Sequence, residues 1–330
     1  MTGNIPTPEA LPLRPPYDPA LQPILNILDP KIFESLESLR KVSSAYSAET
    51  ILTLCPDLKH EEHTAAGTDG AVPLAVFTRK SSSNKSRPAV YVVHGGGQIS
   101  GNRFSALDNT IHFFEGIDIV TISVEYRLAP EFPAPAALND SYAGFVWVVN
   151  HAKELGIDPA KIIILGVSGG APIAAGCAML VTRNQDTKLL GQMLLTPMLD
   201  DRPHHASAKQ FANTGPWCGK VNQMAWDFVL GKDRTEDQEV SELVVPARAT
   251  DLTGLPPTFL DVGEAEVFRD EAVAYASALW RFGVSAELHV WKGGFHVFDM
   301  DVPGNKMAAV AIASVAAKKS WIRRLLELDS

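Results

Sequence analysis

Apolar runs alternate with amphipathic segments along most of the chain. Apolar residues at helical spacing mark residues 139–156, the alanine-rich stretch after Ser168, and residues 269–283. Short runs rich in valine, isoleucine and leucine have the length of buried strands, at residues 72–80, 88–97, 118–127, 161–166, 188–199, 256–263 and 285–294. Strands that are apolar throughout and alternate with helices are typical of a parallel sheet covered on both faces. The pattern therefore predicts an α/β fold with a mostly parallel central sheet.

Other segments depart from this alternation. Residues 1–20 are rich in proline and are expected to run extended over a surface, whereas residues 30–47 carry aliphatic side chains at helical intervals and are expected to form one helix. Residues 200–246 interrupt the alternation before the last strands. An excursion between two strands of one sheet is typical of a lid or subdomain.

The composition limits the classes of function. A chain of 330 residues, 46% of them hydrophobic, can bury a large core, and a net charge of −9 without a basic cluster argues against nucleic acid or an anionic membrane as partner. The three cysteines match neither a disulfide framework nor a zinc site. The longest apolar stretch, residues 307–317, is shorter than the roughly 18 residues of a membrane span, and the first residues do not resemble a secretion signal. We expect a soluble, cytoplasmic protein that binds a small molecule.

A serine flanked by glycines follows the predicted strand at residues 161–166. The segment Gly-Val-Ser-Gly-Gly, residues 166–170, leads directly into the alanine-rich helix. Glycine on both sides would let strand and helix approach closely, with Ser168 at the apex of a strained turn, as in the nucleophile elbow of esterases. The next helix would direct its free amides at the same place. The five residues alone are a weak signal, because a plain tight turn has the same sequence, and their position between strand and helix favours a nucleophile.

A second glycine-rich segment ends an earlier predicted strand, where His94 is followed by Gly95, Gly96 and Gly97. Successive glycines allow backbone amides to turn inward and donate to one developing negative charge, which is the arrangement of an oxyanion hole. A flexible loop is the alternative. The position upstream of the serine favours the oxyanion hole, and the phosphate-binding patterns GxxxxGK[ST] and GxGxxG do not occur.

A serine nucleophile also needs a base and a carboxylate. Of the nine histidines, His296 lies just past the last predicted strand, where a loop can bring it over the sheet, whereas His289 lies within that strand. The order serine, acid, histidine places the acid before His296. The candidates there are Asp261, Glu264, Glu266, Asp270 and Glu271. The first lies inside a strand and the last two begin a helix, where they are expected to act as cap and dipole partners. Spacing leaves Glu264 and Glu266 open.

Taken together, several segments resemble the hormone-sensitive lipase family of α/β-hydrolases, over most of the chain. They are HGGG at residues 94–97, YRLAPEFPAPAALND at 126–140, GVSGG at 166–170, LPPTFLDVGEAEVFRDE at 255–271 and GGFHVF at 293–298. The resemblance implies one α/β-hydrolase domain over residues 1–330, with a helical cap from residues 1 to about 50 and about 200 to 245. The wording around Glu266 is most similar to fungal-type members, which often act on metabolites.

The resemblance also assigns roles. It implies Ser168 as nucleophile, His296 as base and, from the family pattern G-x-x-[DE]-x-x-[RK]-D-E, Glu266 as acid. The oxyanion hole would be the amides of Gly96, Gly97 and Gly169. Two positions depart from the common GDSAG pattern, because Val167 stands where an acidic residue is usual and Gly169 where alanine is usual.

The implied reaction is hydrolysis of short- to medium-chain or metabolite carboxylic esters through an acyl-enzyme, without metal or organic cofactor. Phe211, Trp217 and Met224 are candidates to line an apolar substrate pocket, although residues at helical spacing are more often cap core. Alternatives are lactonisation, acyl transfer or dehydration at the same site, or a small-molecule-binding protein on the same scaffold. The resemblance implies that a homodimer can form through a sheet edge or the last helix; residues 309–326 could supply that helix, but the same apolar pattern also packs a helix on the sheet.

Overall fold

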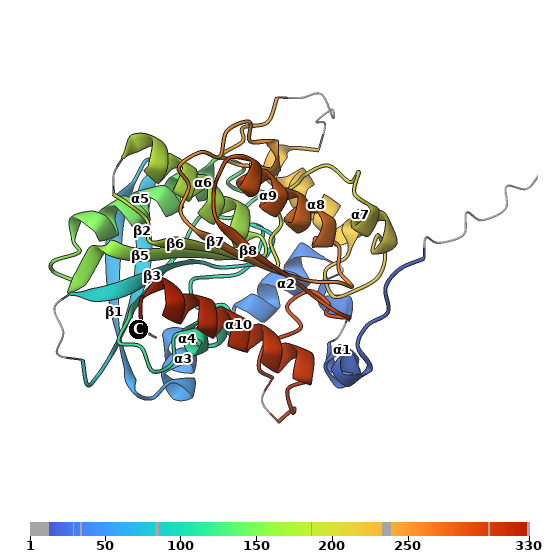
Figure 1. Ribbon diagram of the computed structural model, residues 1–330, viewed down its shortest axis with the longest axis horizontal. Helices are drawn as coiled ribbons and strands as arrows, with labels where there is room; N and C mark the ends of the chain where they lie inside the picture. Colours follow the sequence, from blue (N-terminus) through green and yellow to red (C-terminus); the bar gives the residue numbers. More distant parts are fainter. Residues whose placement is uncertain are drawn as a thin grey trace, which may run out of the picture.

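A single eight-stranded sheet organises the protein, as seen in a computed structural model (Figure 1). The structure describes residues 13–28, 30–33, 35–82, 86–185, 187–232, 239–302 and 304–328. The strand order is β1-β2-β4-β3-β5-β6-β7-β8. Pairs β1/β2 and β2/β4 are antiparallel, and every pair from β4 to β8 is parallel. The predicted, mostly parallel sheet is confirmed.

The strands owe their composition to their place in the sheet. In β5 the side chains of residues 162–165 have no solvent exposure, because helices cover both faces of the sheet. The strand bounds are β1 (Leu58–Gly67), β2 (Gly70–Arg79), β3 (Arg87–Val93), β4 (Val120–Val124), β5 (Ile157–Val167), β6 (Gly191–Leu195), β7 (Thr258–Gly263) and β8 (Ala286–Trp291).

Helices cover the sheet in two layers (Figure 1). One face is covered by α5 (Ala136–Asn150), α6 (Gly170–Asn184) and α9 (Arg269–Arg281), and the other by α3 (Ala48–Leu54), α4 (Leu107–Phe113) and α10 (Ala309–Leu325). The remaining helices are η1 (Pro19–Leu21), α1 (Gln22–Ile27), η2 (Pro30–Phe33), α2 (Leu36–Ser43), α7 (Ala206–Gln210), α8 (Gly219–Leu230) and η3 (Pro246–Arg248).

The first part of the chain differs from the sequence prediction. The single helix expected at residues 30–47 is replaced by η2 and α2, because Ser35 is extended and its hydroxyl accepts a hydrogen bond from the Ser38 amide as the cap of α2. The sequence pattern does not predict strand β1, since residues 59–63 of this edge strand are all charged or histidine and residues 64–67 are all small. Residues 1–12 of the expected extended segment lie outside the described residues.

A separate apolar cluster joins segments far apart in the sequence. Leu39 of α2 packs in it with Phe211, Trp217 and Trp226 from the excursion, and with Phe268 from the loop after β7. The first helices and the excursion thereby share one core at the carboxyl end of the sheet. Within the described ranges, no helix has both the length and the apolar content needed to cross a bilayer.

Candidate active site

Ser168 lies in the turn between β5 and α6. Its φ of 52° is in the left-handed region that L-residues rarely adopt, and its amide donates to the carbonyl of Leu195 on the neighbouring strand at 2.9 Å. Glycine is required beside it, because a Cβ on Gly166 would lie only 2.6 Å from the Cα of Ala171. The strained turn that the sequence predicts is confirmed.

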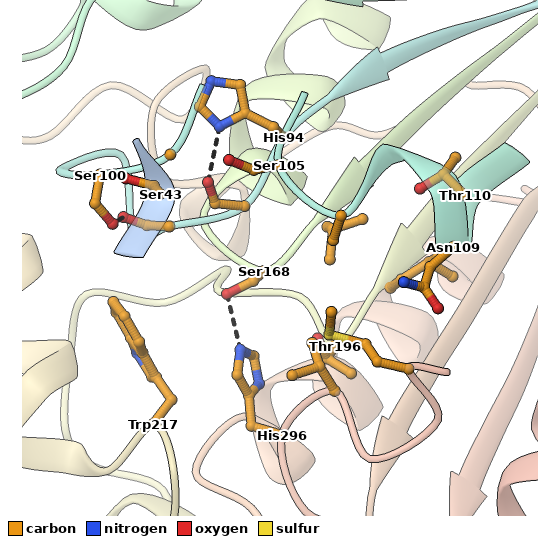
Figure 2. A pocket seen from close by; sticks show the side chains of 18 of the residues that line it. Ser43, His94, Ser100, Ser105, Asn109, Thr110, Ser168, Thr196, Trp217 and His296 are labelled. Carbon is orange, nitrogen blue, oxygen red and sulfur yellow. Dashed lines mark hydrogen bonds between the residues drawn. The ribbon is translucent and has the colours of Figure 1, made fainter. Parts of the chain in front are cut away.

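The hydroxyl of Ser168 contacts the ring of His296 (Figure 2). Its Oγ lies 2.9 Å from His296 Nε2, and His296 Nδ1 lies 2.7 Å from Oε2 of Glu266. The amide of Gly263 donates to the other carboxylate oxygen at 2.8 Å. All three side chains are buried. A continuous line of hydrogen bonds therefore runs from the serine hydroxyl to a carboxylate that is fixed at both oxygens.

The structure distinguishes the two glutamates that spacing left open. Glu264 accepts a hydrogen bond from the amide of Gly293 at 3.0 Å, so its carboxylate braces the loop that carries His296. Glu266, two residues further along the same loop, is hydrogen-bonded to the histidine ring itself. The β7 loop thus contributes one carboxylate to the loop backbone and another to the histidine.

The other three carboxylates of this region have different partners. Asp261 lies inside β7, as predicted. Asp270 and Glu271 lie in the first turn of α9, but the prediction that they cap this helix is wrong, because their carboxylates accept from the amides of Ser207 and Leu199 instead. The acidic residues at the start of α9 therefore bind the chain that leaves β6.

The glycine-rich loop lies beside the serine turn. Gly96 and Gly97 have φ values of 111° and 64°, and a Cβ on Gly169 would overlap the backbone of Gly97. Among the residues that the structure describes, no acceptor pairs with the amides of Gly96, Gly97 or Gly169. These amides are therefore free to donate to a ligand at Ser168.

The side chain of His94 contacts the backbone of this loop. Its Nδ1 lies 2.8 Å from the carbonyl of Gly95, and its ring stacks on Tyr126 with centroids 4.1 Å apart. Burial lowers the pKa of His94, so the ring is neutral near pH 7 and donates from Nδ1.

A cavity of about 270 Å³ opens onto Ser168 and His296 (Figure 2). Trp217 from the excursion lines it, with its ring centroid 6.2 Å from that of His296. Most of the remaining lining is apolar. It comes from η2 and α2 (Ile32, Phe33, Leu39, Val42), from α4 (Phe113) and from the strand ends (Val167, Leu195).

Of the predicted pocket residues, only Trp217 is found at this cavity. Phe211 is fully buried at the end of α7, where its ring packs near Tyr17 with centroids 6.4 Å apart. Met224 lines a different depression, together with Arg14, Tyr17 and Val221. Neither Phe211 nor Met224 is among the residues that line the cavity at Ser168, so this cavity does not support the predicted role of these two side chains.

The cavity also has a polar end that sequence reasoning missed. Asp261, Asp299 and Lys318 line it, and the Lys318 ammonium donates to both carboxylates and to Ser314. Lys318 is 2% exposed. The available signal was a single lysine on the buried face of an alanine-rich helix, four residues after a serine.

One group of side chains has the composition of a metal site. Within the described part of the chain, Asp200, His204 and His205 bring their ligand atoms within 4.8 Å of one another. Arg202 donates to both oxygens of Asp200, at 2.8 and 3.0 Å. The Asp200 oxygens that would bind a cation are therefore already paired with the Arg202 guanidinium. Asp200, His204 and His205 do not line the cavity at Ser168.

The chain is similar to known hydrolases. Residues 90–300 match the model of a protein family that is described as having the α/β-hydrolase fold. Carboxylesterase NlhH of Mycobacterium tuberculosis is 32% identical over 280 residues, which cover 83% of this chain and 86% of the relative. Carboxylic ester hydrolase LipN of the same species is 29% identical, over 82% of this chain and 74% of the relative.

Solved structures agree with these relatives. A bacterial heroin esterase superposes with a TM-score of 0.87 at 34% identity, covering 94% of this chain and 98% of the other. Fungal esterases from Rhizomucor miehei give a TM-score of 0.81 at 25% identity, covering 96% and 98%. The predicted fold is thereby confirmed. Through its sequence, its sheet topology and these relatives, the chain belongs to the α/β-hydrolases, in the branch related to hormone-sensitive lipase.

Proposed function

We propose that this protein is a serine carboxylic-ester hydrolase in which Ser168 is the nucleophile, His296 the base and Glu266 the acid. The observation that carries the proposal is the line of hydrogen bonds from Ser168 Oγ through His296 to Glu266, at 2.9 and 2.7 Å. Relatives named as carboxylesterases support the reaction class. They also favour hydrolysis over lactonisation, dehydration or simple binding.

Acylation begins when His296 Nε2 takes the proton of Ser168 as Oγ bonds to the ester carbonyl carbon. The negative charge that develops on the carbonyl oxygen faces the free amides of Gly96, Gly97 and Gly169, which serve as the oxyanion hole. Glu266 stabilises the imidazolium and holds Nδ1 protonated. His296 then gives its proton to the departing alcohol, and the C–O bond of the ester breaks.

Deacylation repeats these steps with water. His296 Nε2 takes a proton from water as its oxygen attacks the acyl carbon, and it returns that proton to Ser168 Oγ as the acid product leaves. The side chains named here supply every proton transfer in both half-reactions.

The size of the cavity supports short- to medium-chain acyl groups or small metabolite esters. Its volume of about 270 Å³ lies just below the roughly 300–1,000 Å³ typical of ligand pockets. Its lining is mostly apolar, which favours an uncharged acyl chain. Long fatty acyl chains would have to extend beyond it.

The test is hydrolysis of p-nitrophenyl esters from acetate to palmitate. We expect turnover that declines beyond medium chains, and a loss on the order of 10⁶-fold in Ser168→Ala. Ser277→Ala, an exposed serine on α9, is the matched control and should retain full activity. Native protein that neither turns over these esters nor reacts with a fluorophosphonate would contradict the proposal.

We propose further that residues 1 to about 50 and about 200 to 245 form a cap on one α/β-hydrolase domain. The apolar cluster shared by Leu39, Phe211 and Trp226 supports this. Residues 233–238 of that range lie outside the described residues. Limited proteolysis should release fragments that remain associated until the protein is denatured.

We also propose that the protein forms a homodimer through β8 and that it is located in the cytoplasm. β8 is a sheet edge, and Val290 on it is 41% exposed, while Trp280 of α9 is 50% exposed. The cysteines Cys55, Cys177 and Cys218 are all free, which fits a reducing compartment. Sedimentation velocity tests the first point and cell fractionation the second.

A further inference from the structure

A buried ionic cluster holds the loop that carries His296. Asp299, three residues after the histidine, accepts hydrogen bonds from the Lys318 ammonium and from the Ser314 hydroxyl, the latter at 2.6 Å. Lys318 also donates to Asp261 of β7, the strand that leads into the loop with Glu266. One lysine on α10 thus connects the loop after the proposed base to the strand before the proposed acid.

The backbone of the same loop is strained. Val297, the residue directly after His296, has a φ of 55°. A β-branched residue in the left-handed region is a true outlier, because its side chain collides with its own backbone. Such conformations persist only where the surrounding contacts fix them, and they occur preferentially at active sites.

The contacts that fix Val297 lie on both sides of it. Before the strained residue, the His296 ring is held by Glu266 at 2.7 Å and Phe268 packs edge-on to it at 5.2 Å between centroids. After it, the first charged anchor is Asp299 on Lys318. Phe298, between Val297 and Asp299, is also held, by burial in an apolar cluster. Without the Asp299 anchor, only that apolar packing would oppose a rotation of Val297 to a relaxed φ, which would carry the histidine with it.

We propose that Asp299 and Lys318 are positioning residues, which keep the strained Val297 conformation and so hold His296 within reach of Ser168. The inference rests on the function proposed above. Neither residue takes part in the proton transfers. Their effect is on the fraction of time in which His296 Nε2 lies close enough to Ser168 Oγ to accept its proton.

Charge balance gives a variant that isolates this role. Lys318→Met would leave two buried carboxylates without a cation and could prevent folding. Asp299→Ala instead leaves Lys318 paired one-to-one with Asp261, so that only the anchor of the loop is lost. Asp299→Asn keeps an oxygen that accepts from Lys318 and serves as the conservative variant.

The experiment measures kcat and KM for p-nitrophenyl butyrate, with active sites counted by fluorophosphonate titration. We expect Asp299→Ala to lower kcat per titrated site by about 10²-fold, the cost typical of a misplaced catalytic group, with little change in KM. Asp299→Asn should retain most of the native kcat. Asp140→Ala, which removes a buried carboxylate paired with Arg127 away from the loop, should lower the melting temperature and leave kcat per site unchanged.

The strain is tested by a double-mutant cycle. Glycine adopts a φ of 55° without strain, so Asp299→Ala should cost much less kcat in a Val297→Gly background than in the native one. An equal loss in both backgrounds, a native kcat in Asp299→Ala, or a change in KM alone would overturn the inference. If the native protein itself shows no Ser168-dependent hydrolysis, the failure is that of the proposed function instead.

Discussion

At the residue scale, the site depends on small displacements between chemically similar groups. Glu264 and Glu266 are two positions apart, yet one carboxylate binds the Gly293 amide and the other the ring of His296. The Gly263 amide occupies the remaining oxygen of Glu266. The backbone therefore fixes which oxygen faces the histidine.

This arrangement predicts the effect of an amide at position 266. In Glu266→Gln, the carbonyl oxygen would accept from the Gly263 amide, and the NH₂ group would face His296 Nδ1. The ring would then adopt the tautomer that is protonated on Nε2 and could not take the serine proton. We expect kcat to fall about 10⁴-fold, as for amide replacements of triad acids. Glu264→Gln is the matched control, and an equal loss in it would contradict the assignment.

At the element scale, the cap segments determine what reaches the serine. Trp217, in the loop before α8, lines the cavity at Ser168, whereas Met224 of α8 lines a different depression. Two residues only seven positions apart thus line different cavities.

Two alanine variants distinguish these cavities. Trp217→Ala enlarges the pocket and removes an apolar wall, so KM for p-nitrophenyl butyrate should rise at least about tenfold, within the range of apolar pocket contacts. Met224→Ala should leave KM unchanged, since its side chain does not line the cavity. A rise in KM in the methionine variant alone would place the substrate in the other depression.

Glu271, a buried acid in the first turn of α9, makes the stability of the protein depend on pH. Burial raises the pKa of Glu271 well above its usual range, and the nearby charges of Asp200 and Glu266 raise it further, against the opposing effect of the Leu199 amide. Between pH 4.5 and its folded pKa, the native protein therefore binds more protons at Glu271 than the unfolded chain does. The contribution of Glu271 to stability is present below pH 4.5 and is lost as pH rises through that window.

Glu271→Gln removes this titration and keeps an oxygen for the Leu199 amide. Its free energy of unfolding relative to the native protein should increase with pH above 4.5, by about 1.4 kcal/mol per pH unit until the folded pKa is reached. Urea unfolding at a series of pH values measures the difference. The exposed Glu154, changed to Gln, should show no such trend.

At the scale of the whole molecule, the two sheet edges differ. Strand β1 exposes Lys59, Glu61 and Glu62, charges that oppose pairing with another strand. The β8 edge instead exposes Val290, with Trp280 and Ile312 also exposed on the neighbouring helices. An exposed apolar edge favours pairing between copies, whereas a charged one prevents it.

A charge on the second edge should therefore separate the proposed dimer. We expect Val290→Lys to sediment as a monomer at concentrations at which the native protein sediments as a dimer, with unchanged activity per chain. Thr64→Lys on β1 provides the same change on the opposite edge and should not alter the sedimentation coefficient. A native protein that is monomeric throughout would refute dimerisation through β8.

Most of the central sheet and the candidate site could be predicted from the sequence. Short apolar runs rich in β-branched residues and bounded by turn residues indicate buried strands, and the glycines around Ser168 and after His94 favour tight turns that other residues form only with strain. These are local properties, so residues 94–97, 166–170 and the segment with His296 could be identified before the fold was known. The resemblance to a family selected Glu266 among the five carboxylates.

Contacts that depend on direction and distance could be identified only in the three-dimensional structure. The burial of Phe211 and the place of Met224 in a separate depression follow from packing between segments far apart in the chain. The link from Lys318 to Asp299 spans 19 residues, and the one to Asp261 joins α10 to β7. No periodicity encodes such links, because a side chain's partner is set by where its whole element lies in three dimensions.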